Sequence, residues 1–445
     1  MNKTYKIMTF GCQMNENDSE KISGLLKNMG YTPEEDVKKA GVVILNTCSV
    51  RENADVRVFG NLGAFKSVKK VNPDLVLAVC GCMMQQPEIV KKIKEKYPQV
   101  DLVFGTHNIH QFPQMLGNYL QRGERIFEIW DDSSEIIEDL PVDRKYPFKS
   151  FVTIMNGCNN FCTYCIVPYT RGREVSRQPE KIIEEVTRLA DEGCLEVTLL
   201  GQNVNSYGND LKTGYHFADL LRDLNQIEKI KRIRFMTSHP KDLSDEVIEA
   251  IAQCGKVCPA IHLAIQSGST RILKAMNRRY TKEQIIGLVD RVRSRIPDVA
   301  ITTDIIVGFP GETEEDFQDT LEVMRACKFD SAFSFIYSIR TGTPAATMEN
   351  QIPDEVKHDR LNRLLEVLRG ISFGLNSKYE GRVLPVLVEE PSKNNTDRLS
   401  GRTETGKLVN FEGSFDSIGK IVDVKITKTG SFSLTGVEIQ ASDRG

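Results

Sequence analysis

The 445-residue chain lacks the features that would place it in a membrane or in the secretory pathway. No apolar run approaches the roughly 20 residues that a membrane helix needs, so neither a membrane-spanning segment nor a membrane partner is expected. Its start, Met1 to Lys6, runs into a strand-like segment and not into a secretory signal, which predicts a cytoplasmic protein. The net charge of −3 gives no general basic character. Any contact with RNA must therefore come from local patches and shape.

Histidine is scarce as well, whereas cysteine is not. Only six histidines are present, and none lies near the densest group of cysteines, which weakens the case for a zinc site built from both residue types. The eleven cysteines are odd in number and unevenly spread, and a cytoplasmic location disfavours disulfides. Metal binding, catalysis or plain burial remain as explanations.

The length predicts about two to four domains. Residues 1–120 alternate the patterns of buried strands and helices, which predicts an α/β, Rossmann-like domain with a parallel sheet. The expected strands are Lys6–Phe10, Val42–Asn46 and Leu75–Cys80, and the expected helices are Ser19–Met29, Ala54–Val71 and Pro87–Lys96. Residues 121–150 are partly acidic, contain prolines and have little periodicity, so we expect a linker or strap.

A strand followed by a helix recurs six times over residues 151–376. Six repeats are too few for an eight-stranded barrel, so an open, partial (β/α)6 barrel is expected, with its active site at the carboxyl ends of the strands. The expected strands are Phe151–Asn156, Glu196–Leu200, Arg232–Thr237, Ala260–Ile265, Ala300–Val307 and Ser331–Ile336. The expected helices include Pro179–Glu192, Ser244–Gln253, Lys282–Arg295 and Glu314–Cys327.

Residues 377–445 alternate like short strands separated by glycine-containing turns. This pattern favours a small antiparallel β-barrel. The expected strands are Arg382–Val388, Leu408–Phe411, Lys420–Thr427 and Ser433–Ile439. A domain that serves only for packing is the alternative.

The densest cysteine group is Cys158, Cys162 and Cys165, spaced C-x3-C-x2-C directly after the first barrel strand. Thiolates are the ligands that iron–sulfur clusters prefer. Three of them hold three irons of a 4Fe-4S cluster and leave the fourth iron open to a small molecule. A structural zinc site is the alternative, but zinc takes four ligands and no fourth Cys or His lies nearby in the sequence.

This spacing, with an aromatic residue before the last cysteine, resembles that of the radical S-adenosylmethionine (radical SAM) superfamily. The resemblance implies that the amine and carboxylate of S-adenosylmethionine chelate the open iron, and that an electron from the cluster cleaves this cofactor to a 5′-deoxyadenosyl radical. Polar groups near the strand ends then become candidates for cofactor binding: Tyr164, Gln202, Asn203, Ser238, Gln266, Ser267, Asp304 and Arg340. Each alone is more often a turn or cap residue. The superfamily's Gly-Gly-Glu after the second strand is replaced by Leu-Gly-Gln-Asn, and His239 and His262 are catalytic or structural candidates.

Three further cysteines, Cys12, Cys48 and Cys82, each follow a strand of the N-terminal domain. Because the carboxyl ends of parallel strands lie at one edge of a sheet, these thiols are expected to converge. We expect them to ligate a second metal centre, again with one open position. Burial as a small hydrophobic residue is the alternative for a lone cysteine. It is the expectation for the remaining five: Cys80, Cys194, Cys254, Cys258 and Cys327.

Two three-cysteine sets, a partial barrel and a small C-terminal β-domain together resemble the radical SAM methylthiotransferases, whose C-terminal domain is called TRAM. The resemblance covers essentially the whole chain. The segments Thr9–Asn15 and Cys165–Glu174 are similar to the MiaB type, which acts on tRNA, and differ from the types that modify threonylcarbamoyladenosine or a ribosomal-protein aspartate. Ile339–Thr341 departs from the Pro-Arg-Pro that the family often carries.

This resemblance implies two 4Fe-4S clusters, one that generates the radical and an auxiliary one, on Cys12, Cys48 and Cys82, that holds the sulfur to be methylated and delivered. The implied substrate is tRNA bearing N6-isopentenyladenosine immediately 3′ of the anticodon, modified at C2. A flavodoxin-type reductant and a monomer are expected. Arg171 and Arg173 are candidate RNA contacts, with surface solvation as the alternative. A methylthiotransferase for threonylcarbamoyladenosine or for protein, and an iron–sulfur electron carrier, remain alternative functions.

Overall fold

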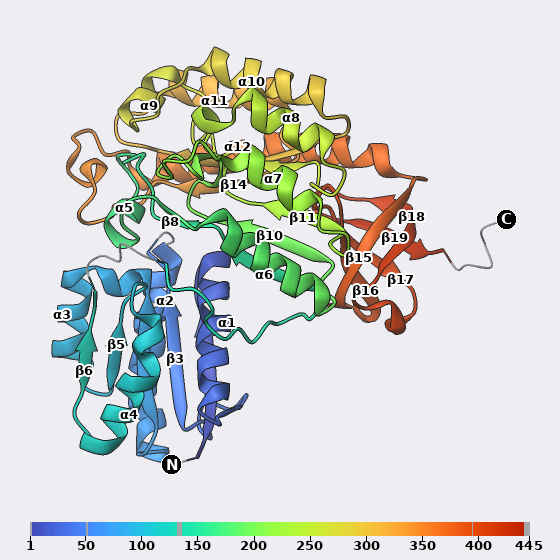
Figure 1. Ribbon diagram of the computed structural model, residues 1–445. Helices are drawn as coiled ribbons and strands as arrows, with labels where there is room; N and C mark the ends of the chain where they lie inside the picture. The colour runs from blue at the N-terminus through green and yellow to red at the C-terminus, as the bar shows by residue number, and fades with distance from the viewer. Residues whose placement is uncertain (1, 50–51, 131–135, 394, 440–445) are drawn as a thin grey trace.

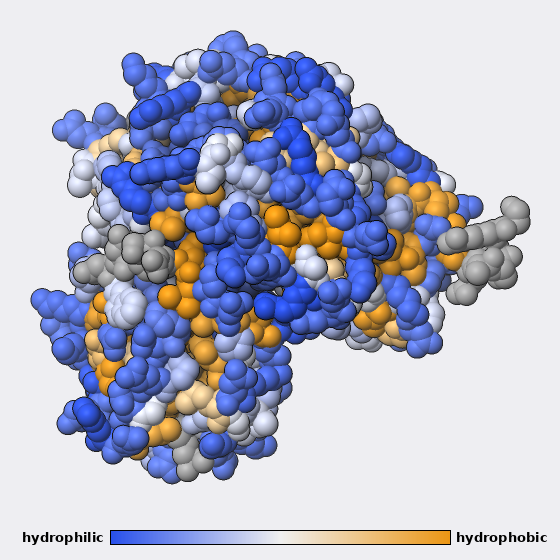
Figure 2. Space-filling view, viewed as in Figure 1, coloured by the Kyte–Doolittle hydropathy of each residue, from blue (hydrophilic) through white to orange (hydrophobic). Residues whose placement is uncertain are grey.

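The computed structural model describes residues 2–49, 52–130, 136–393 and 395–439, which form three units in chain order (Figure 1). The blue N-terminal unit lies below the green-to-orange central unit, and the red C-terminal barrel lies beside the central one. On the face shown in Figure 2, apolar side chains gather at the junction of the first two units and over the C-terminal barrel. No helix in the described ranges is long and apolar enough to cross a membrane.

The N-terminal unit is a parallel sheet with strand order β2-β1-β3-β4-β5-β6. Its strands are β1 (Thr4–Thr9), β2 (Thr32–Pro33), β3 (Val42–Thr47), β4 (Val76–Gly81), β5 (Leu102–Phe104) and β6 (Ile126–Glu128). Its helices are α1 (Gln13–Asn28), α2 (Glu52–Val71), α3 (Pro87–Lys96) and α4 (Phe112–Arg122). Every residue of β3 and β4 is buried, as expected for strands covered on both faces.

The sheet extends beyond residue 120, where the sequence placed its end, because β6 pairs with β5. Strands of three residues, such as these two, are too short to produce a recognisable apolar pattern. The described part of the connection that follows, residues 136–148, is a strap without helix or strand. Asp143 in this strap accepts hydrogen bonds of 2.7 Å from Ser23 and Lys27 on α1, and Glu138 pairs with Arg177 of the central unit. The strap therefore binds both neighbouring units.

The central unit is a partial barrel of six parallel strands, which confirms the predicted fold class. Its strands are β7 (Lys149–Thr153), β10 (Glu196–Leu200), β11 (Arg232–Phe235), β12 (Ala260–His262), β13 (Ala300–Val307) and β14 (Ser331–Ile336). Two three-stranded sheets, β7-β10-β11 and β12-β13-β14, are joined by parallel bridges such as Ser238 to Leu263. Its helices are α5 (Val167–Thr170), α6 (Pro179–Asp191), α7 (Phe217–Asn225), α8 (Asp245–Gln253), α9 (Thr270–Ala275), α10 (Lys282–Arg295), α11 (Glu314–Cys327) and α12 (Asp354–Asn376).

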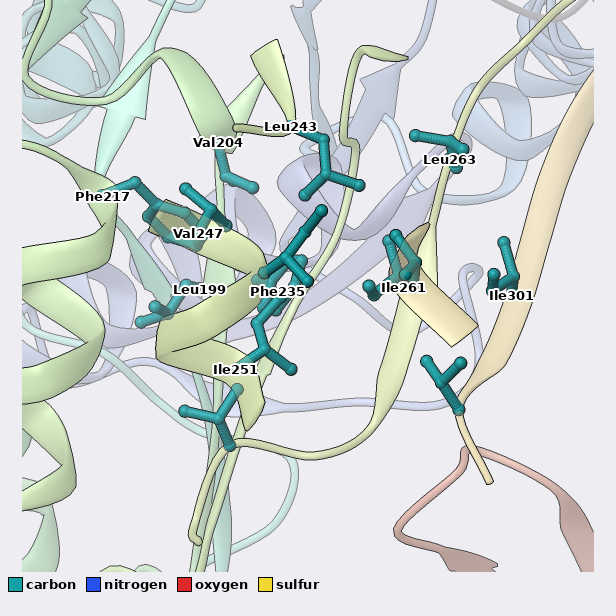
Figure 3. Packing of buried hydrophobic residues seen from close by; sticks show 14 of the residues in the cluster. Leu199, Val204, Phe217, Phe235, Leu243, Val247, Ile251, Ile261, Leu263 and Ile301 are labelled. Carbon is teal, nitrogen blue, oxygen red and sulfur yellow. The ribbon is translucent and has the colours of Figure 1, made fainter. Parts of the chain in front are cut away.

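The largest core lies between the barrel strands and their outer helices. Figure 3 shows Leu199, Phe235, Ile261 and Ile301 from four successive strands, packed with residues such as Val247 of α8. Each strand thus places alternate side chains in this outer core, and the intervening ones face the inside of the barrel.

The first barrel strand is shorter than the predicted Phe151–Asn156. The parallel strand ends at Thr153, and after Ile154 the two residues of β8 (Met155–Asn156) pair antiparallel with β9 (Val175–Ser176). This pairing closes the base of the loop that carries the C-x3-C-x2-C cysteines, so the end of the predicted strand belongs to the site and not to the barrel.

The C-terminal unit is a closed barrel with strand order β15-β16-β17-β19-β18. The strands are β15 (Val383–Ser392), β16 (Asn395–Thr403), β17 (Leu408–Glu412), β18 (Ile421–Thr429) and β19 (Leu434–Glu438). Four of the five pairings are antiparallel, as predicted, but β17 and β19 pair in parallel and close the barrel. β16 was missed in the sequence because it begins with the polar run Asn395–Arg398, whose first three residues are exposed.

Two arginines of β11 attach this barrel to the central unit. Arg232 donates to the main-chain carbonyls of Arg402 and Pro385, both at 2.9 Å. Arg234 donates to those of Glu404 and Thr403, at 2.8 and 2.7 Å. All four acceptors belong to the C-terminal unit, which therefore covers the inside of the central barrel near β11.

Candidate iron–sulfur sites

The loop of Cys158, Cys162 and Cys165 begins at a glycine that the geometry requires. Gly157 has φ +77°, and a Cβ there would lie 1.9 Å from the carbonyl oxygen of Arg173. The close approach allows the backbone N–H of Cys158 to donate to the carbonyl of Gly172 at 3.1 Å. The two ends of the cysteine loop are thereby joined directly beneath the first cysteine.

The three thiols of this loop are gathered closely enough to influence one another electrostatically. Burial raises the pKa of the Cys165 thiol to about 12 and also raises that of Cys158. The side-chain amide of Asn160 donates to the sulfur of Cys158 at 3.4 Å. Because the thiolate is the form that ligates a metal, binding a cation here would displace the thiol protons.

Arg278, which the sequence did not single out, donates to the sulfur of Cys162 at 3.4 Å. It is 7% exposed and also donates to the hydroxyl of Tyr280 at 2.6 Å. Its neighbour Asn277 donates to the carbonyls of Asn160 and Phe161 at 3.1 and 3.0 Å. The turn after α9 therefore supports the cysteine loop and offers hydrogen bonds and charge of the kind that tune iron–sulfur clusters. More than a hundred residues separate these partners, so no local sequence signal reveals them.

The second set of cysteines lies at the carboxyl ends of β1, β3 and β4. Cys12 precedes α1, Cys48 follows β3, and Cys82 begins a 3-10 turn directly after β4. A Cβ on Gly11 would lie 2.6 Å from the Cβ of Cys48, so the first two cysteine loops touch at this glycine. Burial raises the pKa of Cys82, and the charge of Cys12 raises it further, which places these two thiols near each other. The structure thus brings the three predicted strand ends together.

Across the described ranges, no three His, Cys, Asp or Glu side chains are arranged to hold a single metal ion. A 4Fe-4S cluster is larger than an ion and keeps its thiolate ligands farther apart. The thiols of the first set influence one another electrostatically, as do those of Cys12 and Cys82 in the second. Sulfurs in both sets accept hydrogen bonds from nearby donors, which fits ligands of such a cluster.

Arg171, in the segment that follows the C-x3-C-x2-C loop, contacts the second cysteine set. It follows α5, the short helix directly after Cys165, and its Nε donates to the sulfur of Cys82 at 3.2 Å. Its Nη2 forms an ion pair of 2.8 Å with Asp18 of α1, and the two side chains are 7% and 8% exposed. The guanidinium of Arg171 is therefore buried between the units and already has protein partners, which speaks against the predicted RNA contact. Arg173 is exposed and lies over the ring of Phe161 at 4.3 Å.

The predicted cofactor-binding residues lie at the carboxyl end of the barrel, and several already bind protein groups. Gln202 accepts from the N–H of Gly157, and Asn203 donates to Asp242 at 2.7 Å. Ser238 donates to Asn205 at 3.2 Å. Ser267 is completely buried, and its hydroxyl lies 3.4 Å from that of Thr320. These contacts hold the loops in place and leave a cofactor role of the side chains as a prediction.

The other predicted residues are closer to the inside of the barrel. Tyr164 packs against an apolar cluster that contains Phe309 and Tyr337. Gln266 has φ +71°, and its backbone bridges to β13. Asp304 lies 3.2 Å from the ring of His262, and Arg340 follows β14. Burial lowers the pKa of His239 to about 2, and this ring accepts from the N–H of Lys241 at 3.2 Å, which fits the structural alternative for that histidine.

Comparison with known families matches three parts of the chain. Residues 152–324 match the radical SAM superfamily, residues 4–105 match the uncharacterized protein family UPF0004, and residues 377–437 match the TRAM domain. Among solved structures, the chain is similar to a radical S-adenosylmethionine methyltransferase, TsrM, from Kitasatospora setae. The TM-score is 0.55 and the identity 14%, over 78% of this chain and 77% of that one. At this identity the likeness concerns the fold alone.

Curated relatives are far more similar in sequence. A protein from Clostridium tetani is 59% identical over 98% of this chain and 96% of its own length. One from Alkaliphilus oremlandii is 58% identical over 99% of this chain and 93% of its own length. Both are named tRNA-2-methylthio-N(6)-dimethylallyladenosine synthase. With this identity over nearly the whole length, the chain belongs to the family of tRNA-2-methylthio-N(6)-dimethylallyladenosine synthases, within the radical SAM superfamily.

Proposed function

We propose that this protein adds a methylthio group to C2 of N6-isopentenyladenosine, immediately 3′ of the anticodon in tRNA. The observation that carries the proposal is that Arg171, six residues after Cys165, reaches Cys82 of the second cysteine set across the boundary between the two units. One set generates the reactive species, and the other supplies the sulfur. The names of the curated relatives support tRNA as the substrate.

Radical SAM membership implies a 4Fe-4S cluster and S-adenosylmethionine as cofactors. Together they supply a radical that removes hydrogen from a C–H bond too weakly acidic for acid–base chemistry. The residues of this chain bind the cluster and hold its loop in place. The Cys158 loop binds the cluster through three thiols, Arg278 and Asn277 fix that loop, and Tyr164 adds an apolar wall beside it.

The second cluster is the finer part of the proposal. We place it on Cys12, Cys48 and Cys82, where three ligands leave one position open for the sulfur to be methylated and delivered. The proposal further includes a reductant of the flavodoxin type, a monomeric enzyme and a cytoplasmic location. Arg173, exposed beside the cysteine loop, is proposed as an RNA contact.

The function is tested by mass spectrometry of bulk tRNA from cells that lack this protein. We expect methylthiolated isopentenyladenosine to disappear and unmethylthiolated isopentenyladenosine to accumulate in an equal amount. Re-expression of the wild-type chain restores the product. An unchanged tRNA profile, or a loss confined to threonylcarbamoyladenosine derivatives or to a ribosomal protein, would show that another substrate is used.

Replacing Arg171 tests the connection between the two cysteine sets. Arg171→Gln leaves Asp18 as a buried charge without its partner, which is expected to destabilise the chain by about 3–5 kcal/mol. It also removes a cationic N–H donor from Cys82, so the reduced, more negative cluster loses stabilisation. We expect a lower midpoint potential for the auxiliary cluster, measured by redox titration in a Cys158→Ala background.

Arg188→Gln is the control for this experiment, because Arg188 forms an exposed ion pair on α6, on which neither cysteine set lies. It is expected to leave both the stability and the potential unchanged, within about 0.5 kcal/mol for the stability. Arg171→Lys keeps the charge and is expected to be intermediate. An auxiliary-cluster potential identical in Arg171→Gln and the parent would refute the connection.

A further inference from the structure

The inner face of the barrel exposes two aromatic side chains on its last strand. Phe333 and Phe335 of β14 are 49% and 36% exposed, whereas the alternate residues Ala332 and Ile336 pack against the outer core. Two large apolar residues on one face of a barrel strand, both open to solvent, are unusual unless that face binds something.

The neighbouring strand continues this surface. Asp304 and Ile306 of β13 are the register partners of Phe333 and Phe335. Paired residues share a face of a sheet, so all four side chains lie on the inside of the barrel. His262 of β12 adds its ring, which meets that of Phe333 edge-on at 5.7 Å and lies 3.2 Å from Asp304.

This surface leads to the cysteine loop at one end. Ile306 packs against the same apolar cluster as Tyr164, which lies between Cys162 and Cys165 in the chain. Cationic side chains near the start of β11 and β14 have protein partners of their own. Arg232 and Arg234 are occupied by carbonyls of the C-terminal unit, and Lys407 forms a 2.6 Å ion pair with Asp330. Phe333, Phe335 and Ile306 therefore form a continuous apolar wall that starts beside the cluster-binding loop.

We propose that Phe333, Phe335 and Ile306 form a subsite for the branched hydrocarbon substituent on N6 of the substrate adenosine, and that this subsite selects the prenylated base. The inference rests on the proposed function. The N6 substituent is the proposed occupant because a base that reacts beside the Cys158 loop places this apolar group within reach of the adjoining wall. A hydrocarbon has no polar atoms, so it can be buried against these three apolar side chains while Asp304 and His262 keep their contact with each other. Burying it against two aromatic rings removes exposed apolar surface from both partners.

The test measures binding of two anticodon stem-loops, one with N6-isopentenyladenosine and one with unmodified adenosine, to the cluster-loaded enzyme. For the wild-type chain we expect the prenylated stem-loop to bind about 10- to 100-fold more tightly. The double variant Phe333→Ala/Phe335→Ala is expected to bring this ratio close to one. Its affinity for the unmodified stem-loop should stay within about twofold of wild type, because phosphate contacts supply that part of the binding. Phe335→Leu, which keeps an apolar side chain, should retain most of the preference.

Phe373→Ala is the matched control, since Phe373 is 53% exposed on α12, outside the barrel. It should leave the ratio unchanged. Iron content and S-adenosylmethionine-dependent deoxyadenosine formation without RNA verify that each variant is folded and loaded. A wild-type preference that survives the double variant, or one that Phe373→Ala removes equally, overturns the subsite. If wild-type enzyme forms no methylthio product from prenylated tRNA, the proposed function itself fails, which is a separate result.

Discussion

Cys158→Ala is expected to reduce the release of 5′-deoxyadenosine from S-adenosylmethionine at least 100-fold, to the background of the assay. The remaining thiols, Cys162 and Cys165, cannot hold three irons, so the cluster that cleaves the cofactor is lost. The measurement is chromatography with mass detection after anaerobic incubation with dithionite. Methylthiolated tRNA should be absent as well, because no radical is formed.

Cys327→Ala is the control, because Cys327 is 1% exposed in the outer core of the barrel and has no place in either set. It should keep deoxyadenosine release within about twofold of wild type. The iron content of Cys158→Ala should fall by about half, with the other half retained on the N-terminal set. Deoxyadenosine release at the wild-type rate would remove this loop from cofactor cleavage.

Cys48→Ala is expected to remove only one of the two products. Deoxyadenosine release should persist, since the Cys158 loop and its supports are intact, whereas methylthiolated product should fall to background. The reason is that only two thiols, Cys12 and Cys82, would remain for the proposed auxiliary cluster, so the sulfur would have no site from which to be delivered. Both products are quantified in the same reaction with prenylated tRNA.

Together, Cys158→Ala and Cys48→Ala distinguish the roles of the two cysteine sets in one assay. Cys80→Ala is the matched control for the second, because Cys80 is the buried cysteine two residues before Cys82, and its substitution should leave both products unchanged. Methylthiolated tRNA from Cys48→Ala in wild-type amounts would mean that the inserted sulfur comes from elsewhere.

The sequence was sufficient for most of the architecture, for identifiable physical reasons. Strands buried on both faces, such as β3 and β4, have continuous apolar runs that cannot be mistaken for loops. The six barrel strands repeat with a helix between them, which gives their number and their active edge. Strand β16 was missed because its register depends on its neighbours in the closed barrel and not on its own polar first half.

The two cysteine sites were likewise predicted only in part. The cysteines could be located because each lies directly after a strand, where topology alone determines position. The groups that surround the thiols could not. Arg278 and Arg171 donate to cysteines 116 and 89 residues away. The sequence did not single out Arg278, and it made Arg171 a candidate RNA contact. Burial and partners decide the role of an arginine, and these are set by the three-dimensional fold.

The way in which the C-terminal barrel is attached makes its position insensitive to many substitutions. Arg232 and Arg234 bind the barrel through carbonyl oxygens of its main chain, which every amino acid possesses. Substitutions at Pro385, Arg402, Thr403 or Glu404 therefore do not remove the acceptors. Side chains on the outer surface of the barrel can therefore be replaced while these four hydrogen bonds continue to hold it against the central unit.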